Sequence, residues 1–576
     1  MSYKEKLQEW LESDFVLPEF KDELRGITDE KELEDRFYTE LEFGTAGLRG
    51  VLGAGTNRMN IYTVGKATEG LARHLKANVE HPSCAIAYDS RIKSDEFAKV
   101  SALILAAHGV KVYLYDALAP VPLLSFAVRH YKTSAGIVIT ASHNPQAYNG
   151  FKVYGSYGGQ VTDEEADNIL KEIRSIERFE DVSSITEEEA AEKGLLEYIG
   201  EEVLKTYIDS IKTLTVKKDM VKENADKLNI IYTPIHGSGN IPVRRVLKEL
   251  GYTNVNVVKE QELPDGTFPT APYPNPENPQ VFELALKLAE EVNPDIIFGT
   301  DPDCDRVGVI VKDSAGNDRV LSGNQIGMLI TYYLLKAMKE ENTIPENGVV
   351  IKTIVSTESV RNITDDFGVE LLDVLTGFKY IGEKIEEYQE TKEKTFIFGF
   401  EESFGYLAGT YVRDKDAVVA SMILCEIATY YKTRGMTLYD ALVEIYEKYG
   451  FFREEIESFT LAGKDGQEKI RKCIQYFRDN TITEIGGVKT LYKEDYKLRE
   501  KVSVQTGEKT TITLPESNVI KYTLEDESWF VVRPSGTEPK MKAYMAVKGH
   551  SLEDAEEKLS QFKSEVISIV NRGFEN

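Results

Sequence analysis

The sequence predicts an α/β fold in which three similar mixed α/β (αβα) domains precede a C-terminal α+β domain. Two observations carry this prediction. A pattern of strand, helix, glycine and second strand occurs three times, and each copy is typical of the βαβ unit of a mostly parallel sheet. After about residue 456 the pattern changes, and β-rich sequence leads into one long helix. A chain of 576 residues is long enough for about three to five domains.

The three repeats define the core of each predicted α/β domain. Their first strands are expected at residues 84–88, 229–232 and 349–354. Each is followed by a helix that ends at a glycine, namely Gly109, Gly251 and Gly368. The second strands are expected at residues 110–115, 254–258 and 369–374. Such right-handed connections bring the loops that follow the strands to a common edge of the sheet, where open α/β sheets place their chemistry.

The domain boundaries are expected to give four segments, at residues 1–205, 206–320, 321–455 and 456–576. Acidic helices are expected in the first 40 residues. The acidic stretch 163–225 is expected to be helical and to join the first two domains, and the proline-rich stretch 264–279 to form a long ordered loop. In the last domain, strands within 522–547 should lead into a helix over 551–570.

The composition excludes several classes of protein. A net charge of -27 at pH 7 argues against non-specific binding to nucleic acid or to an anionic membrane. The four cysteines lie far apart without metal-type spacing, which suits a reducing compartment and buried thiols. The first residues lack a secretory apolar core, and no apolar run approaches the ~18 residues that a membrane helix needs. We therefore expect a soluble, cytoplasmic protein.

The first candidate functional element is a serine at the end of a predicted buried strand. Residues 136–139 are mostly β-branched and stop at the sequence Thr-Ala-Ser-His-Asn-Pro, which contains Ser142 and His143. Pro145 biases the residue before it to extended geometry, so that no helix begins there at once. We expect the serine on a stiff loop, where a neighbouring group must activate it as a nucleophile.

A second strand, over residues 295–300, ends in three alternating aspartates, Asp301, Asp303 and Asp305. In an extended backbone alternate side chains lie on one side, so we expect the three carboxylates to converge. Such carboxylates repel one another unless a cation lies between them, and hard oxygen ligands suit Mg²⁺. Two alternatives remain: a solvated acidic turn, and an aspartyl-phosphate enzyme in which one aspartate is the nucleophile.

Two further loops combine small residues with groups that bind phosphate or hydroxyls. Gly-rich residues 43–50 contain Arg49, whose guanidinium suits phosphate, although a Gly-rich turn with a surface arginine is an equal alternative. A strand over 395–400 runs into Glu401 and Ser403, which offer acceptors and donors to the hydroxyls of a polyol. An ordinary turn also explains this second loop.

The remaining candidates carry lysines, hydroxyls and an arginine. Lys415 is flanked by acids, which is typical of a surface ion-pair cluster but also suits a proton donor and phosphate ligand. Thr376 and Gly377 form a small-residue turn at a strand end. The last predicted strand opens into a nest for a dianionic phosphate, made by Arg533, Ser535, Gly536, Thr537 and Lys540. This segment lacks the Walker spacing, so a nucleotide P-loop is not indicated.

Together these motifs resemble those of the α-D-phosphohexomutase superfamily, from about Phe43 to the C-terminus. The motifs Thr-Ala-Ser-His-Asn-Pro, Asp-Pro-Asp-Cys-Asp-Arg, Gly-Phe-Glu-Glu-Ser-Phe-Gly and Arg-Pro-Ser-Gly-Thr occur in the family's order. The resemblance implies four domains around a central cleft, each supplying one loop. It also implies a phosphorylated Ser142 and one Mg²⁺, bound by the phosphoserine together with Asp301, Asp303 and Asp305.

The resemblance implies roles for the other residues. His143 and Lys415 are the implied acid and base. The implied substrate-binding residues are Arg49, Arg306, Thr376, Gly377, Glu401, Ser403 and Lys415. The substrate's non-reacting phosphate would be bound by Arg533, Ser535, Gly536 and Thr537. Whether Lys540 or Lys542 joins them stays open.

The implied reaction moves a phosphoryl group from the serine to a sugar phosphate, and the bisphosphate then returns its other phosphoryl group. Residues 401–403, Glu-Glu-Ser, resemble the phosphoglucomutase branch, so we expect glucose 1-phosphate and glucose 6-phosphate to be interconverted through glucose 1,6-bisphosphate. The chain length and aspartate loop are similar to a subgroup that includes phosphopentomutases. A phosphopentomutase or phosphomannomutase is therefore the alternative, and an aspartyl-phosphate sugar phosphatase or a non-catalytic sensor a remote one. The expected partners are small sugar phosphates, and monomer and dimer both stay open.

Overall fold

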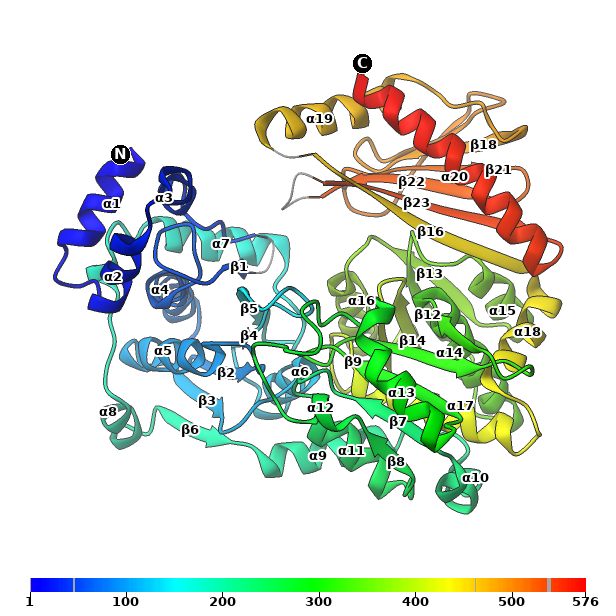
Figure 1. Ribbon diagram of the computed structural model, residues 1–576, viewed down its shortest axis with the longest axis horizontal. Coiled ribbons are helices and arrows are strands. Elements are labelled where there is room, and N and C mark those ends of the chain that lie inside the picture. The colour runs from blue at the N-terminus through cyan, green and yellow to red at the C-terminus, as the bar shows by residue number, and fades with distance from the viewer. Residues whose placement is uncertain (1, 45–46, 462, 536–539, 576) are drawn as a thin grey trace. The chain divides into compact units, whose positions relative to one another are not determined.

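The computed structural model describes residues 2–44, 47–461, 463–535 and 540–575 (Figure 1). The chain forms two compact units, each described by itself below. Unit 1 consists of Met1–Gly323, Ile381–Gly399 and Ser403–Leu438, and unit 2 of Asn324–Tyr380, Phe400–Glu402 and Tyr439–Asn576. Helices pack on mixed sheets along most of the chain, and a sheet-rich segment ends it, which confirms the predicted α/β fold class.

The first sheet of unit 1 has six strands in the order β1-β5-β4-β2-β3-β6. Their bounds are β1 (Gly47–Val51), β5 (Tyr148–Gly155), β4 (Ala135–Ile139), β2 (Ser83–Tyr88), β3 (Lys111–Tyr115) and β6 (Leu196–Ile199). Strand β2 runs parallel to both β3 and β4, which confirms the first predicted βαβ unit. Strand β5 runs antiparallel to β4 and β1, so the sheet is mixed rather than mostly parallel.

Helices cover this sheet because its strands are apolar on both faces. Helices α4 (Ile61–Asn78), α5 (Ser94–Ala107) and α7 (Asp163–Arg174) share a core with alternate residues of β2 and β4. Helix α6 (Val121–Tyr131) packs on the same two strands with apolar side chains outside that core. The N-terminal helices α1 (Tyr3–Glu12), α2 (Pro18–Gly26) and α3 (Glu30–Phe37) pack around Trp10 and Phe37.

The stretch 163–225 is not wholly helical, as we expected it to be. It contains α7, η1 (Phe179–Asp181), α8 (Glu187–Glu192), α9 (Glu201–Lys212) and α10 (Lys218–Asn224), but also β6. The short run Leu-Glu-Tyr-Ile of β6 pairs in parallel with β3 and extends the first sheet. Tertiary pairing with an available strand edge therefore overrides the acidic, helix-favouring composition around it.

The second sheet of unit 1 has the order β11-β10-β9-β7-β8. Its strands are β11 (Asp318–Leu321), β10 (Val307–Lys312), β9 (Ile296–Thr300), β7 (Ile230–Thr233) and β8 (Val255–Val257). Strand β7 is parallel to β8 and β9, as the second repeat predicts. Its shorter flanking elements are η2 (Ala225–Lys227), α11 (Asn240–Glu249), α12 (Lys259–Glu262), η3 (Pro279–Phe282) and α13 (Glu283–Val292). Residues 263–278 form no helix or strand, which agrees with the predicted long loop.

The third sheet has the order β13-β12-β14-β15. Its strands are β13 (Glu370–Val374), β12 (Gly348–Thr353), β14 (Thr395–Glu401) and β15 (Gly405–Ala408). The parallel pair β12 and β13 confirms the third repeat. The helices of this region are α14 (Gly323–Glu340), α15 (Ser359–Phe367), α16 (Phe378–Thr391), α17 (Ala417–Lys432) and α18 (Leu438–Tyr449).

The C-terminal part of unit 2 is an eight-stranded antiparallel sheet. Its strands follow the order β16 (Phe451–Thr460), β23 (Lys540–Gly549), β22 (Trp529–Pro534), β21 (Ile520–Leu524), β18 (Val488–Asp495), β19 (Glu500–Ser503) and β20 (Lys509–Thr511), with β17 (Glu484–Ile485) paired to β18. Helices α19 (Gly463–Asp479) and α20 (Leu552–Glu575) share one core with this sheet (Figure 1).

The cysteines and the helices agree with the compositional analysis. All four cysteines are buried and unpaired. Among the described residues, no helix combines the length and the apolar character required to cross a lipid bilayer.

Candidate active site

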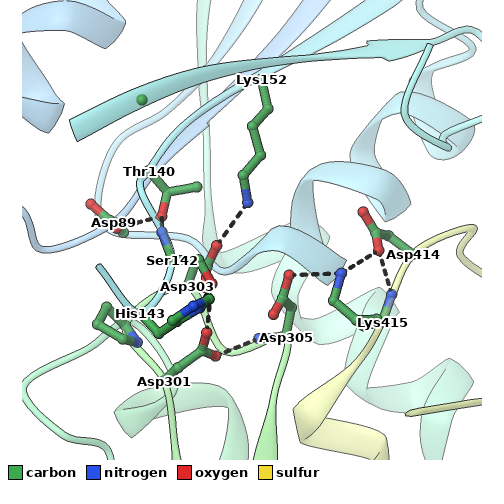
Figure 2. A network of polar contacts seen from close by, with 12 residues as sticks. Asp89, Thr140, Ser142, His143, Lys152, Asp301, Asp303, Asp305, Asp414 and Lys415 are labelled. Carbon is green, nitrogen blue, oxygen red and sulfur yellow. Dashed lines mark hydrogen bonds and ion pairs between the residues drawn. The ribbon is translucent and has the colours of Figure 1, made fainter. Parts of the chain in front are cut away.

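Ser142 lies on the turn that follows β4, at the carboxyl end of the parallel strands (Figure 2). Its φ is 52°, a left-handed conformation that costs a non-glycine residue roughly 1–3 kcal/mol. Two hydrogen bonds hold the turn. The Ser142 N–H donates to Thr140 Oγ1 at 2.8 Å, and the Thr140 hydroxyl donates to Asp89 Oδ2 at 2.6 Å. The serine is therefore fixed by a buried network rather than by the proline alone.

The three aspartates follow β9 on a tight turn, not on the extended backbone that we expected. Cys304 takes a φ of 51°, and the N–H groups of Asp305 and Arg306 both donate to Asp301 Oδ1 at 3.0 Å. These bonds favour the turn over an extended strand because they satisfy two backbone donors at once. The carboxylates nevertheless converge, since one oxygen from each of the three lies within 4.8 Å of the others.

The serine loop and the aspartate loop meet. The Ser142 hydroxyl donates to Asp301 Oδ2 at 2.8 Å, and Ser142 Oγ lies 3.2 Å from His143 Nδ1 (Figure 2). The candidate nucleophile, an imidazole and a carboxylate are thus in contact inside unit 1. This is the group of neighbours that an otherwise weak serine nucleophile requires.

The carboxylate cluster fits a divalent cation. All three aspartates are buried, and Asp303 Oδ1 and Asp305 Oδ1 accept no hydrogen bond from any residue that the structure describes. Buried oxygens without partners are costly, and a hard cation that takes oxygen ligands would satisfy them. The donor set is therefore that of a divalent metal ion.

Two lysines neutralise part of the cluster's charge. Lys152 Nζ lies 3.1 Å from Asp303 Oδ2, and Lys415 Nζ lies 3.1 Å from Asp305 Oδ2. Burial, together with the charges of Asp303 and Asp305, raises the pKa of Asp301 well above its usual value. Burial likewise acts to raise the pKa of Asp303, but Lys152, the hydrogen bond with Asp301 and Lys415 together outweigh it, and the net shift is downward. Arg306 Nε also lies 3.9 Å from Asp305 Oδ1, so two ammonium groups and one guanidinium face the three carboxylates.

Besides Asp305, Lys415 also contacts Asp414, the residue before it in the chain. Its ammonium donates to Asp414 Oδ1 at 3.0 Å (Figure 2). Asp414 Oδ2 accepts from the Tyr154 hydroxyl at 2.6 Å. Gly405 gives the side chain its path, because a Cβ there would lie 2.2 Å from Lys415 Cδ. Lys415 is therefore a buried, fixed cation and not the surface ion pair that was the alternative.

The charges of two arginines, Arg306 and Arg49, act on the imidazole of His143. Burial and the positive charges of Arg306 and Arg49 hold the pKa of His143 well below its ordinary value, so the imidazole is neutral at pH 7. Arg306 forms an ion pair with Glu277 of the proline-rich loop. Arg49 is an exposed residue of β1, opposite Gly150 of β5. The structure thus brings both arginines within electrostatic reach of the serine loop.

The remaining predicted residues belong mostly to unit 2, and Ser403 follows β14 within unit 1. Burial and the charges of Glu402 and Glu401 raise the pKa of Tyr544, while Arg533 opposes the shift, so Glu401 and Arg533 flank one tyrosine. The buried Thr376 Oγ1 has no hydrogen-bond partner among the described residues.

The predicted phosphate nest is only partly described. The Ser535 N–H donates to the Lys540 carbonyl at 2.8 Å, whereas Gly536 and Thr537 lie outside the described residues. Lys542 is the cross-strand partner of Arg533 in the antiparallel pair of β22 and β23. Side chains of directly opposed residues lie on the same face of a sheet, which favours Lys542 over Lys540 as the neighbour of Arg533.

Sequence analysis missed Lys152, Asp89 and Arg91. Lys152 lies within β5 and reaches Asp303 only because β5 folds back beside β4, which no local pattern indicates. Asp89 and Arg91 were detectable, because they follow the predicted strand 84–88 at the same sheet edge as Ser142.

Comparisons with known proteins agree with this geometry. Three family models match in succession, and their descriptions are phosphoglucomutase/phosphomannomutase alpha/beta/alpha domains I, II and III, at residues 40–180, 205–316 and 322–449. A phosphoglucomutase of Staphylococcus haemolyticus is 37% identical over 92% of this chain and 94% of its own. A phosphoglucomutase of Staphylococcus saprophyticus is 36% identical over 94% of this chain and 96% of its own.

A solved structure has the same fold. The crystal structure of a putative phosphomannomutase from Thermus thermophilus superimposes with a TM-score of 0.69 at 21% identity, and covers 92% of this chain and 99% of its own. The sequence relatives show an enzyme, an isomerase that works by phosphoryl transfer, as the motifs implied. The chain belongs to the phosphoglucomutase/phosphomannomutase family of the α-D-phosphohexomutase superfamily.

Proposed function

We propose that this enzyme interconverts glucose 1-phosphate and glucose 6-phosphate through a phosphoserine at Ser142 and a glucose 1,6-bisphosphate intermediate. The observation that carries the proposal is the 2.8 Å hydrogen bond from the Ser142 hydroxyl to Asp301, at the edge of a buried three-carboxylate cluster. The names of the sequence relatives support glucose as the sugar. The bisphosphate would also serve as the activator that phosphorylates the resting serine.

In the forward reaction the phosphoserine O–P bond breaks and a bond forms between phosphorus and a sugar hydroxyl oxygen. The sugar hydroxyl proton passes to a base, and the serine oxygen takes up a proton as it leaves phosphorus. The serine hydroxyl gives this proton up again when the bisphosphate returns its other phosphoryl group. His143 is suited to accept a proton because its imidazole is neutral at pH 7. Lys415, held between Asp305 and Asp414, is suited to donate one and to attract phosphate.

Mg²⁺ is the metal that the donor set favours, with ligands from Asp301, Asp303, Asp305 and the phosphorylated Ser142. When bound, it supplies positive charge that balances the charge of the transferring phosphoryl oxygens. The chain's own contribution is to fix the nucleophile, to bury it from water and to hold Lys152 and Lys415 beside the carboxylates. Exclusion of water matters because an open phosphoserine would be lost to hydrolysis.

The other predicted residues are proposed to bind the sugar phosphate. Glu401 and Ser403 would bind sugar hydroxyls, and Thr376, with its buried unpartnered Oγ1, would contact the substrate beside Gly377. Arg49 and Arg306 would bind the reacting end. The non-reacting phosphate is assigned to Arg533, Ser535, Gly536 and Thr537.

The test combines one variant with two substrates. Ser142→Ala should abolish turnover of glucose 1-phosphate, and peptide mapping of the wild-type protein should place acid-stable phosphate on the peptide that contains Ser142. Turnover of ribose 1-phosphate at a rate well above that of glucose 1-phosphate would instead identify a phosphopentomutase. Alkali-labile phosphate on the peptide that contains Asp301, with release of inorganic phosphate, would identify the aspartyl-phosphate alternative.

A further inference from the structure

Arg91 connects the serine loop to the strand beside it. It lies on the loop between β2 and α5, and its side chain is fully buried. The guanidinium donates to four carbonyl oxygens of the serine loop and the residues after it. Nη2 donates to Ser142 O at 2.5 Å and to Asn144 O, and Nη1 donates to Pro145 O at 3.0 Å and to Tyr148 O at 3.1 Å.

Asp89, two residues earlier, holds the same loop from its amide side. Its carboxylate accepts from the Thr140 hydroxyl at 2.6 Å, and that hydroxyl oxygen accepts the Ser142 N–H. Asp89 also accepts from the Arg91 N–H at 2.9 Å, and its Oδ2 lies 3.4 Å from Arg91 Nε. Together Asp89 and Arg91 hold the N–H and the carbonyl of Ser142, whose left-handed backbone needs such support.

A second set of contacts joins Arg91 to the proline-rich loop between β8 and β9. The guanidinium carbon lies 5.0 Å from the centre of the Phe268 ring, a cation–π contact, and Phe268 is fully buried. Gly266 packs directly on the backbone of the Arg91 loop, because a Cβ there would lie 2.5 Å from Ile92 N and 2.7 Å from Ser90 O. Arg91 is thus clamped between the serine loop and the proline-rich loop.

The proline-rich loop in turn supports the aspartate loop. Thr270 Oγ1 lies 2.9 Å from His236 Nε2. Two residues after this histidine, the Ser238 N–H and hydroxyl both donate to the carbonyl of Pro302 at 2.8 Å, between Asp301 and Asp303. A continuous path of contacts therefore runs from Ser142 through Arg91 and the proline-rich loop to the metal-binding turn.

We propose that Arg91 is a positioning residue for phosphoryl transfer, which with Phe268 fixes the Ser142 loop against the aspartate loop. The proposal rests on Ser142 being the phosphorylated residue. Arginine is required because its rigid fork reaches four carbonyls at once, whereas a lysine ammonium is a point donor. A displacement of the nucleophile by about 1 Å can cost about 10²-fold in rate.

The experiment uses Arg91→Lys and Phe268→Leu in the full-length protein, with Lys93→Gln as the matched control. Lys93 lies on the same loop, but its side chain is half exposed and pairs only with Glu96 in the described contacts. We measure kcat and KM for glucose 1-phosphate, and the single-turnover rate of phosphoryl transfer from the phosphoenzyme. For Arg91→Lys we expect kcat and the transfer rate to fall by about 10–100-fold, with KM changed less than about twofold. Phe268→Leu should show the same split with a smaller loss, and Lys93→Gln should behave as wild type.

The split between kcat and KM separates positioning from a general loss of structure. Rates that fall only in proportion to the folded fraction, measured by circular dichroism, would overturn the proposal, and so would a wild-type transfer rate in Arg91→Lys. If Arg91→Lys does not fold, Phe268→Leu decides by the same readouts. Ser142→Ala is assayed in parallel: activity in that variant refutes the proposed function, whereas an inactive Ser142→Ala with a wild-type Arg91→Lys refutes only the role of Arg91.

Discussion

Unit 1 contains a buried cluster of charges and unit 2 a partly buried one around Lys352, and the two clusters are built differently. In unit 2 the four carboxylate oxygens of Glu358 and Asp373 each lie within 3.0 Å of a nitrogen of Lys352 or Arg361. Among the described residues, Asp303 Oδ1 and Asp305 Oδ1 in unit 1 accept no hydrogen bond of good geometry, and neither does Asp373 Oδ1 in unit 2. A carboxylate oxygen without a hydrogen bond therefore occurs in both clusters and does not by itself identify a site.

The carboxyl pKa values of the unit 2 cluster are both lowered, whereas those of the aspartate cluster are mixed: that of Asp303 is lowered and those of Asp301 and Asp305 are raised. Although burial acts to raise it, Lys352 and Lys521 lower the pKa of Glu358, and Lys352 likewise lowers that of Asp373. Burial and neighbouring carboxylates raise the pKa of Asp301. In unit 2 three cations, Lys352, Arg361 and Lys521, face two carboxylates and stabilise the fold. In unit 1 three cations, Lys152, Lys415 and Arg306, face three carboxylates that converge on one point, which suits a metal. The convergence of three carboxylates without an excess of cations is the feature that distinguishes the candidate binding site from the structural ion cluster.

The largest expected effect follows from removing one carboxylate of the aspartate cluster. Asp303→Asn should lower kcat by about 10²–10³-fold, because it removes a proposed metal ligand and unbalances Lys152. Its melting temperature without metal should also fall, because the lowered pKa of Asp303 means that its charge is net favourable and Lys152 Nζ loses the carboxylate 3.1 Å away. Steady-state kinetics and thermal melts check both statements, and a stable variant with near-native kcat would remove the distinction between the clusters.

For the Lys352 cluster of unit 2 we expect a substitution to lower the stability of the protein rather than its activity. Lys352→Met leaves the partly buried Glu358 and Asp373 with fewer partners and should cost about 3 kcal/mol of unfolding free energy, the lower end of the cost of breaking a buried pair. Lys432→Met, which breaks the more exposed pair with Asp295, is the control and should cost less than about 1 kcal/mol. Urea denaturation measures both variants. Equal losses would mean that the Lys352 cluster has no special structural role.

Metal binding gives a test that does not depend on activity. Mg²⁺ at 100 times its Kd should stabilise the wild-type protein by about 2.7 kcal/mol and raise its melting temperature. The rise should be absent in Asp303→Asn but retained in Lys352→Met, because only the first variant changes the aspartate cluster. A rise of the same size in both would place the stabilising metal elsewhere.

The smallest effect concerns pH. The pKa of Glu358 is lowered in the folded state, so its stabilising contribution is present above the unfolded pKa of about 4.3 and is lost as pH falls towards the folded value. Lys352, Arg361 and Lys521 face this carboxylate and keep it charged. The difference in stability between wild type and Glu358→Gln should be constant from pH 8 to about 5 and shrink below about pH 4. A difference that grows on acidification would contradict this assignment.

The fold was predictable from sequence where the signals are local. Alternating strand and helix patterns with a terminal glycine predicted three parallel pairs, β2–β3, β7–β8 and β12–β13, which the structure contains. The antiparallel strand β5 and the edge strand β6 were not predicted, because their partners are set by tertiary pairing. The local sequence pattern therefore predicts the individual βαβ units, whereas the pairing of further strands with them is decided by the whole fold.

The candidate site shows the same limit. The motifs located Ser142 and the three aspartates, but the turn conformation at Cys304 depends on hydrogen bonds to Asp301 that spacing does not reveal. Lys152 contacts Asp303, which lies 151 positions later in the sequence, and Arg91 contacts Ser142, which lies 51 positions later. Residues that carry chemistry are thus easier to find from sequence than residues that hold them in place.

The reactivity of the Cys304 thiol can report whether the aspartate turn is open or closed. Its thiol is fully buried, and burial raises its pKa well above the usual value, so the closed turn does not present a reactive thiolate. Alkylation at this position requires the turn to open, and its rate therefore measures the free energy of local opening. Mass spectrometry can measure how fast a thiol reagent alkylates each cysteine. If a cation or a sugar phosphate slows the alkylation of Cys304 but not that of Cys84 and Cys425, it binds at the aspartate turn.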